Sequence, residues 1–231
     1  MYNLVSIVLP VYNQSDHVRD IVLQYLAPLD ALGFPYELIL AVNGCRDSSL
    51  QICEELAATH PHVRVMHSEQ GGWGLGVKLG LHAAQGDLLC YTNSARTSPS
   101  DLTLMICYGL ANPGKIIKAN RKIRDGITRR LGSLLYNLEC RMLFDLSVWD
   151  INGTPKIFPR SCDKLLALTC NDDMIDAEFN AVCRKENYPV LEVPIFSARR
   201  HGGTSTTRLS SAFRMYIGAL RLKKRLSELS S

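Results

Sequence analysis

The chain has 231 residues, of which 46% are hydrophobic and 21% charged, and its formal net charge is +4. This composition excludes an intrinsically disordered chain and suffices for one domain with a full core. No apolar run approaches the ~20 residues of a membrane span, and the first residues enter a strand pattern without a basic leader. We therefore expect a cytoplasmic protein without transmembrane helices.

The eight cysteines form no Cys-x-x-Cys pair and lie mostly in apolar periodic segments, which predicts reduced, buried thiols. The charge is uneven, because residues 115–145 hold eight Lys or Arg against three acids and residues 196–231 hold eight against one. The second half therefore presents a basic surface suited to an anionic partner. That partner is not expected to be a nucleic acid, since no helix-turn-helix or aromatic-basic ribonucleoprotein motif is present.

Strand and helix patterns alternate over residues 4–91. Hydrophobic strands are expected at residues 4–9, 36–42, 63–66 and 88–91, with amphipathic helices between them. This alternation predicts an α/β fold with a mostly parallel, right-handed doubly wound sheet flanked by helices. Sheets of this kind place their ligands at the carboxyl ends of the strands.

Two helix entries in this part of the chain carry expectations. Ser15 or Asp16 should cap the first helix, and Pro28 should kink or shorten it. The glycine-rich segment 71–76 opens the third helix, where unpaired backbone N–H groups suit the approach of a phosphate or nucleotide. Its spacing fits neither the dinucleotide fingerprint nor the P-loop, and an ordinary turn is the alternative.

The segment 86–96 changes from an apolar strand to small polar residues and then to a cation. Residues 88–91 predict a short strand that is buried on both faces, and Asn93, Ser94 and Ala95 form the loop that leaves its carboxyl end, just before Arg96. We expect the chemistry of the protein here.

The second half begins with a further strand at residues 115–120, which delivers Arg121 to its carboxyl end. A helix expected over residues 128–144 has leucines and a methionine at helical spacing on one face. Another face carries a polar stripe of Arg129, Ser133 and Asn137. This stripe is either an anion cradle or a solvated basic face.

The remaining elements complete the pattern. Residues 150–158 predict a turn that returns into a strand, as a structural turn or as a pocket wall. A helix that begins near residue 172 carries Asp176 and Glu178, and helix capping alone explains most of its acids. Residues 190–195 predict the final strand.

Two cationic segments follow. Residues 200–205 form a glycine-containing basic loop that is typical of a lid. Residues 208–231 predict a basic amphipathic helix, which lies in a membrane interface or packs on the domain with a solvated face.

The first half of the chain carries four short motifs, one after another: Pro10 to Gln14, Asn43 to Ser48, Gly74 to Val77 and Ala84 to Asp87. Their order and spacing are those of a known enzyme family. With them the chain resembles the A-fold nucleotide-sugar glycosyltransferases, and among these the polyprenyl-phosphate (dolichyl-phosphate mannose synthase-like) branch. The resemblance implies a single-domain, Rossmann-like glycosyltransferase A fold. The implied organisation is a catalytic domain at 1–207, with a nucleotide-sugar half at about 1–114 and an acceptor half at 115–207, and the helix at 208–231.

The resemblance also assigns site residues by position. The implied nucleotide-sugar-binding residues are Pro10, Tyr12, Gln14, Val42, Asn43, Gly74, Asn93, Ser94, Ala95 and Arg200. The implied contacts to the acceptor phosphate are Arg121, Arg129, Ser133 and Ser205. The implied catalytic residues are Asp176, Glu178 and Arg96. Gln14 and Val42 stand where the family usually has acids, so the base of the nucleotide stays unspecified.

Most members of the family carry Asp-x-Asp where this chain has Asn93, Ser94 and Ala95, and those carboxylates hold a divalent ion against the donor diphosphate. Two carboxylates with one divalent cation sum to about zero charge, whereas Asn93, Ala95 and Arg96 without metal sum to about plus one. We therefore expect no metal cofactor, because Arg96, helped by Arg200, takes over the role of the metal. Hard divalent cations strongly prefer carboxylates to neutral oxygens.

The expected activity is inverting transfer of a hexose from a nucleotide diphosphate sugar, of the GDP-mannose or UDP-glucose type, to a polyprenyl phosphate at the inner membrane face. Such a displacement needs a neutralised leaving diphosphate and an acceptor held in line. A phosphate acceptor is already anionic, so Asp176 is expected to orient hydroxyls or the acceptor instead of removing a proton. Transfer to a soluble acceptor and a non-catalytic nucleotide-sugar-binding scaffold stay open as alternatives.

Overall fold

The structure is a computed structural model that describes residues 2–122, 127–196 and 209–228. Its strands are β1 (Val5–Val11), β2 (Tyr36–Asn43), β3 (Val63–Ser68), β4 (Leu88–Tyr91), β5 (Ile116–Arg121), β6 (Lys156–Pro159) and β7 (Val190–Ile195). Its α-helices are α1 (Val18–Asp30), α2 (Ser49–Thr59), α3 (Trp73–Ala83), α4 (Pro99–Ala111), α5 (Ile127–Phe144), α6 (Ile175–Lys185) and α7 (Leu209–Glu228), and η1 (Asp163–Leu166) is a 3-10 helix.

All seven strands belong to one sheet, in the order β3-β2-β1-β4-β6-β5-β7. Strand β6 runs antiparallel to both of its neighbours, and the other pairs are parallel. The chain thus has the mostly parallel α/β sheet that the strand and helix pattern predicts. The strand order reverses between β1 and β4, and the carboxyl ends of these two strands are therefore where a ligand crevice is expected.

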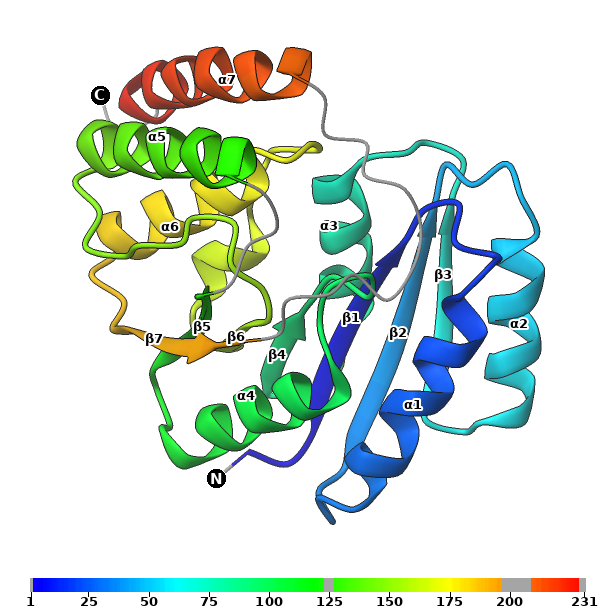
Figure 1. The fold of residues 1–231 in the computed structure, drawn as a ribbon. Helices are drawn as coiled ribbons and strands as arrows, with labels where there is room; N and C mark the ends of the chain where they lie inside the picture. Colours follow the sequence, from blue (N-terminus) through cyan, green and yellow to red (C-terminus); the bar gives the residue numbers. More distant parts are fainter. Residues whose placement is uncertain (1, 123–126, 197–208, 229–231) are drawn as a thin grey trace.

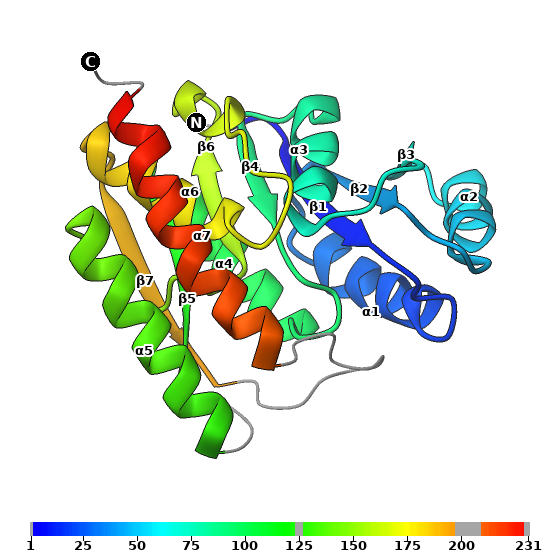
Figure 2. The same cartoon turned by 90° about the horizontal axis from the view of Figure 1, so that it is seen from above.

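Helices cover both faces of this sheet (Figures 1 and 2). Helices α1, α2 and α4 pack on one face, against alternate residues of β1 such as Ile7 and Leu9. Helices α3, α5, α6 and α7 belong to the core of the other face, which includes Val8. Alternation along β1 thus sends successive side chains into two separate cores. Both cores are built from the apolar residues that the strand patterns predict.

Helix α1 begins later than its sequence suggests. It starts at Val18, and the residue before it, His17, makes no side-chain cap. The prediction that Ser15 or Asp16 caps this helix is therefore wrong. The backbone N–H of Ser15 instead donates to Asp47 Oδ2 at 3.0 Å, which joins the loop after β1 to the loop after β2.

Helix α4 was not predicted from the sequence, although its entry carries a signal. The Ser98 hydroxyl accepts from the Asp101 backbone N–H at 3.1 Å, and Pro99 occupies the first turn. A capping serine followed by proline is a typical helix start.

Helix α5 packs on the protein with a different face from its row of leucines. Its inward face is formed by Tyr136, Asn137, Cys140 and Phe144, which are all buried. The apolar row of Leu134, Leu135, Leu138 and Met142 is 49–71% exposed. The polar stripe therefore points toward the protein at Asn137, and the solvated-face interpretation of this stripe is wrong at that position.

Helix α7 lies beside α5, as both views show (Figures 1 and 2). The Tyr216 hydroxyl donates to the Gly132 carbonyl oxygen at 3.0 Å, and Ala219 and Leu222 are buried. The C-terminal helix thus packs on the domain with one face, and contact of this helix with a membrane stays a prediction. None of the helices in the described ranges is both long and apolar enough to cross a membrane.

Candidate active site

Two loops that are far apart in the sequence meet at the carboxyl ends of β1 and β4. The Ser94 hydroxyl, after β4, donates to Gln14 Oε1, after β1, at 2.8 Å. The Gln14 backbone N–H in turn donates to the Ser49 hydroxyl at 2.8 Å. Tyr12 precedes Gln14 in the same loop and is 49% exposed. The structure thus joins the loop that carries Tyr12 and Gln14 to Ser94 at the point where the strand order reverses.

Other predicted donor-binding residues lie deeper in the fold. Pro10 is buried within β1, and the Val42 side chain is fully buried in the core on the α1 face. Asn43 is also buried, where its Nδ2 donates to the Val11 carbonyl oxygen at 3.2 Å and its Oδ1 accepts from the Gly72 N–H at 2.9 Å. Asn43 therefore ties β1 to the entry of α3, and its role toward a nucleotide stays a prediction.

The glycines at the entry of α3 permit close backbone contact. A Cβ on Gly74 would lie 2.5 Å from the Cys170 carbonyl oxygen, and one on Gly72 would lie 2.3 Å from that of Asn171. The Leu75 N–H donates to this Asn171 oxygen at 3.0 Å. Part of the helix N-terminus is thus used to hold the segment before α6, although the sequence suggests a phosphate approach here. Binding of a nucleotide sugar at Gly74 stays a prediction.

The loop after β4 offers no carboxylate to a metal ion. Asn93 Oδ1 accepts from the Ala95 N–H at 3.0 Å, and the Ser94 hydroxyl is engaged with Gln14. Arg96 is half-buried in the same loop, where its backbone N–H donates to the Asn93 carbonyl oxygen at 3.1 Å. Two neutral oxygens already used within the protein do not suit a divalent ion of the Mg²⁺ or Mn²⁺ type. The described residues also hold no group of three or more His, Cys, Asp and Glu placed for a metal.

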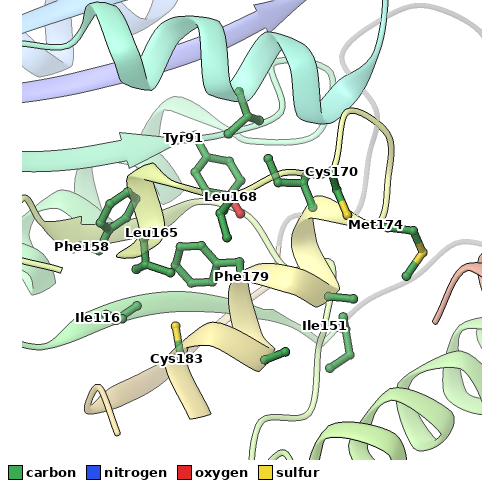
Figure 3. Close-up of a cluster of buried hydrophobic side chains, with 14 of the residues drawn as sticks. Tyr91, Ile116, Ile151, Phe158, Leu165, Leu168, Cys170, Met174, Phe179 and Cys183 are labelled. Carbon is green, nitrogen blue, oxygen red and sulfur yellow. The ribbon is translucent and has the colours of Figure 1, made fainter. Parts of the chain in front are cut away.

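Asp176, near the start of α6, is 4% exposed and accepts from three side chains. Tyr91 donates its hydroxyl to Oδ1 at 2.9 Å, Trp73 donates its indole N–H to Oδ2 at 3.1 Å, and the Lys156 ammonium is paired with Oδ1. Figure 3 shows Tyr91 and Phe179 among the buried side chains of the core, and their ring centroids are 5.8 Å apart. Trp73, Tyr91 and Lys156 were not singled out in the sequence, where each reads as an ordinary core or strand residue.

Glu178 lies two residues later and turns to different partners. Its carboxylate accepts from the backbone N–H groups of Thr169 and Cys170, from the Thr169 hydroxyl at 2.7 Å, and from Arg225 of α7. Burial alone raises the pKa of Glu178, but these hydrogen bonds outweigh it and lower the pKa below its ordinary value. The structure thus separates Glu178 from Asp176, and a catalytic role for Glu178 stays a prediction.

Arg121 is the last residue of β5, and its guanidinium forms a bidentate ion pair with Asp150. Its Nε donates to Asp150 Oδ2 at 2.8 Å and an NH2 to Oδ1 at 2.9 Å. Asp150 is buried, and the turn it opens passes so close to β5 that a Cβ on Gly153 would lie 1.9 Å from the Ala119 carbonyl oxygen. The segment is thus a turn whose Asp150 holds Arg121, and its role as a pocket wall stays a prediction. Binding of an acceptor phosphate by this guanidinium stays a prediction.

The other predicted acceptor residues are described only in part. Ser133 is half-buried on α5, one turn before the buried Asn137. The backbone of Arg129 lies in the first turns of α5, whereas its side chain lies outside the described residues. Arg200 and Ser205 fall in the range 197–208, which is also outside them.

Comparison with known proteins bears on this geometry. The family model described as glycosyl transferase family 2 matches residues 6–143. An undecaprenyl-phosphate 4-deoxy-4-formamido-L-arabinose transferase of Pseudomonas fluorescens (strain Pf0-1) is 26% identical over 207 residues, which cover 87% of this chain and 59% of that protein. The transferase of the same name from Pectobacterium atrosepticum is 25% identical over 209 residues, covering 87% and 62%. The chain spans about three-fifths of the length of these relatives.

Solved structures show the same fold. Glucosyl-3-phosphoglycerate synthase from Mycobacterium tuberculosis, in complex with Mn²⁺, UDP and glucosyl-3-phosphoglycerate, matches with a TM-score of 0.70 at 17% identity, covering 95% of this chain and 78% of that one. A mycobacterial protein matches with a TM-score of 0.72 at 19% identity, covering 96% and 74%. At these identities the likeness is one of fold.

Proposed function

Because the chain belongs to glycosyl transferase family 2, we propose that it is a glycosyltransferase that moves a hexose from a nucleotide diphosphate sugar, of the GDP-mannose or UDP-glucose type, to a polyprenyl phosphate. The acceptor class is supported by the relatives that are named undecaprenyl-phosphate sugar transferases. The acceptor phosphate oxygen attacks the anomeric carbon, and the bond from that carbon to the donor diphosphate breaks. The leaving diphosphate keeps the electron pair, and the configuration inverts.

The observation that carries the donor site is the contact between the loops after β1 and β4. The hydrogen bond from Ser94 to Gln14 joins the loop that carries the exposed Tyr12 to the loop that contains Arg96. An aromatic ring suits a nucleotide base, and a guanidinium suits a diphosphate because it donates to two oxygens at once. Both groups lie at the carboxyl ends of adjacent parallel strands, where α/β sheets bind ligands.

Arg96 neutralises the leaving diphosphate in this proposal, and no metal ion takes part. The support is the chemistry of the donor set, because Asn93 and Ser94 supply neutral oxygens that are engaged within the protein. A fixed cation at the leaving group stabilises the charge that develops as the bond to the sugar breaks. Arg200 is proposed to assist from the 197–208 segment.

The protein is further proposed to act at the cytoplasmic face of a membrane, through α5. The exposed row of Leu134, Leu135, Leu138 and Met142 is the surface that supports this contact. Next to Met142 in the sequence, the Arg141 guanidinium stacks 3.9 Å from the centroid of the exposed Trp149 ring. Apolar, aromatic and cationic side chains in this combination suit an anionic lipid surface.

The test is a transfer assay with purified protein, UDP-glucose or GDP-mannose as donor, and undecaprenyl phosphate in detergent as acceptor. Mass spectrometry of the lipid fraction should show the hexosyl phosphate with one donor, at the same rate with EDTA and with added Mn²⁺. Arg96→Ala should lower kcat by about 10²–10³-fold, which is the usual loss when a donor to a developing negative charge is removed. Arg19→Ala, which removes an exposed cation of α1 that pairs with Glu55, is the matched control.

Three outcomes would count against parts of the proposal. A requirement for Mn²⁺ would overturn the metal-independent role of Arg96. Transfer to a soluble glycan but not to the lipid phosphate would replace the acceptor. Nucleotide binding by calorimetry without any turnover would favour the non-catalytic scaffold.

A further inference from the structure

The Asp176 carboxylate is almost fully committed to side chains of the protein. An ionised carboxylate accepts at about four positions, and Trp73, Tyr91 and Lys156 fill three of them. The three donors come from the start of α3, the end of β4 and the start of β6. All three chain positions lie at the edge of the sheet where the loops after β1 and β4 meet. About one acceptor position, on Oδ2, therefore remains for a ligand among the described residues.

Lys156 is the charged member of this set and has no exposed surface. It opens β6 and pairs across the ladder with Tyr91, the last residue of β4. Its ammonium lies 5.3 Å from the ring centroids of both Tyr91 and Phe179, which flank it. Taking a lysine out of water is costly unless it is paired, and Asp176 supplies the pairing charge.

A second buried lysine lies directly opposite on the neighbouring strand but serves another acid. Lys118 of β5 is the ladder partner of Lys156 and is also fully buried. Its ammonium donates to Glu192 Oε1 at 3.0 Å and to the Asp150 carbonyl oxygen. The strand pair thus divides its two cations between two acids. Only Lys156, of these two lysines, has a contact to Asp176.

We infer that Lys156 is a positioning residue: together with Trp73 and Tyr91 it fixes the Asp176 carboxylate, so that the remaining acceptor position of Oδ2 meets a hydroxyl of the transferred sugar. The role toward the sugar rests on the proposed function, whereas the placement of the carboxylate rests on the four side chains alone. A carboxylate fixed by three donors is a well-oriented hydrogen-bond acceptor for a sugar hydroxyl, and Lys156 acts only through it. This division of roles fits an acceptor phosphate that needs no general base.

Protonation of Lys156 should control this arrangement. Burial lowers its pKa to about 8, the charge of Asp176 opposes this effect, and the nearby Lys118 reinforces it. Asp150 also raises the pKa of Lys156. Above about pH 8 the ammonium therefore loses its proton, and Asp176 loses its charged partner. A rise in pH should release the carboxylate from its fixed position.

The other titratable groups around this ammonium behave differently. Burial raises the pKa of Tyr91 well above its ordinary value, and burial also raises that of the Cys183 thiol on α6. Both groups stay neutral near pH 8. Burial lowers the pKa of Lys118, which makes Lys118 the group to control for.

Stability and catalysis should move in opposite directions with pH. The unfolded chain keeps the ordinary lysine pKa of 10.5, so between pH 8 and 10.5 it binds more protons than the folded chain at this position. The titration of Lys156, whose ammonium loses its proton at lower pH in the folded than in the unfolded chain, therefore raises the free energy of unfolding as the pH rises. Loss of the ammonium nevertheless displaces Asp176 and should lower kcat. A merely structural lysine would not produce this divergence.

The first experiment needs no substrate, because Trp73 reports on Asp176 through its indole hydrogen bond. In a Trp149→Phe background, which leaves Trp73 as the single tryptophan, the emission should change with an inflection near pH 8. The inflection should persist in Lys118→Met and disappear in Lys156→Met and Lys156→Arg. An inflection that survives Lys156→Met, or is absent from the parent, would overturn the inference.

The second experiment applies the hexose transfer assay to the same variants. Lys156→Met should lower kcat by about 10²-fold with little change in the donor KM, as expected for a misplaced orienting group. Lys156→Arg should retain more activity and lose the fall in kcat above pH 8. If Lys156→Met does not fold, Asp176→Asn replaces it, and it should abolish the emission inflection. Equal losses of kcat in Lys118→Met and Lys156→Met would contradict the positioning role.

The two experiments separate the two claims. If the parent protein transfers no sugar, the proposed function fails while the emission titration still decides the placement by Lys156. If transfer occurs and the inflection is absent, the proposed function stands and this inference falls.

Discussion

Two carboxylates on one helix turn show how strongly the surroundings of a residue decide its role. Asp176 faces Trp73, Tyr91 and Lys156 near the end of β4, whereas Glu178 faces the backbone before α6 and Arg225 of α7. Both are buried, and they are only two positions apart. The two side chains point in opposite directions from α6. Asp176 meets the side chains near the end of β4, whereas Glu178 links α6 to the segment before it and to α7.

We therefore expect Glu178→Gln to act on stability. The amide replaces one accepting oxygen with a donor that faces the N–H groups of Thr169 and Cys170, which should cost about 1–3 kcal/mol of unfolding free energy. Since the pKa of Glu178 is lowered in the fold, its stabilisation is present above the ordinary value of 4.5 and is lost as the pH falls below it. Urea unfolding at pH 7 and pH 4 should show a difference between parent and variant that shrinks at pH 4.

Glu54→Gln, on the exposed face of α2, is the matched control and should leave stability nearly unchanged. A loss of sugar transfer in Glu178→Gln at unchanged stability would instead support the catalytic role that the family resemblance implies.

At the scale of elements, the surroundings of α5 differ from those of an ordinary amphipathic helix. Its packed face includes Asn137, whose Oδ1 accepts from the Ile151 N–H at 3.3 Å, while its leucine row points outward. A contiguous exposed apolar row is unusual on a protein surface and commonly marks an interaction site. The row lies on the helix that also carries the predicted acceptor residues Arg129 and Ser133. Lipid contact and acceptor binding would thus share one element.

We expect Leu135→Glu combined with Leu138→Glu to weaken binding to vesicles that contain phosphatidylglycerol by at least about tenfold. Each leucine loses about 1 kcal/mol or more of apolar burial, and each glutamate adds repulsion from the anionic surface. Both positions are exposed, so the melting temperature should change little. Vesicle co-sedimentation measures the effect, with Leu104→Glu on the exposed side of α4 as the control. Equal binding by both variants would show that α5 does not contact the lipid.

At the scale of the whole molecule, the two halves of the predicted catalytic domain share one sheet. Strand β4 of the first half pairs with β6 of the second, and the Arg160 guanidinium donates to the Gly86 and Ala84 carbonyl oxygens at 2.7 and 2.6 Å. The Trp73–Asp176 hydrogen bond also crosses between them. Neither half thus has a complete core of its own, and a functional division near residue 114 stays a prediction.

We expect the full chain to unfold in urea in one transition that is the same by far-UV circular dichroism and by tryptophan emission. Residues 1–114 alone would leave one edge of β4 unpaired and should fail to give a cooperative transition. Two separated transitions in the full chain, or cooperative unfolding of the fragment, would show that the halves are independent folding units.

The sequence defined most of the elements, because strand and helix periodicity depend on local burial patterns that are visible along the chain. Strands β4 and β7 match their expected ranges, and the loops after β1 and β4 were predicted as the donor site. Helix α4 was not predicted, although Ser98 as the N-cap and Pro99 in the first turn are typical of a helix start. The start of α1 was misplaced because Asp47, which is distant in sequence, holds Ser15 in the loop.

What the sequence alone determined is the fold class, since hydrophobic spacing is a local property; from loop composition it also predicted the edge of the sheet at which the site is proposed. Only the tertiary structure decided that Asp176 meets Trp73, Tyr91 and Lys156, and that the leucine row of α5 points outward. A periodic pattern records that one helix face is apolar and leaves open what covers it. A buried charge is likewise tolerated only beside a partner, and that partner can come from any part of the chain.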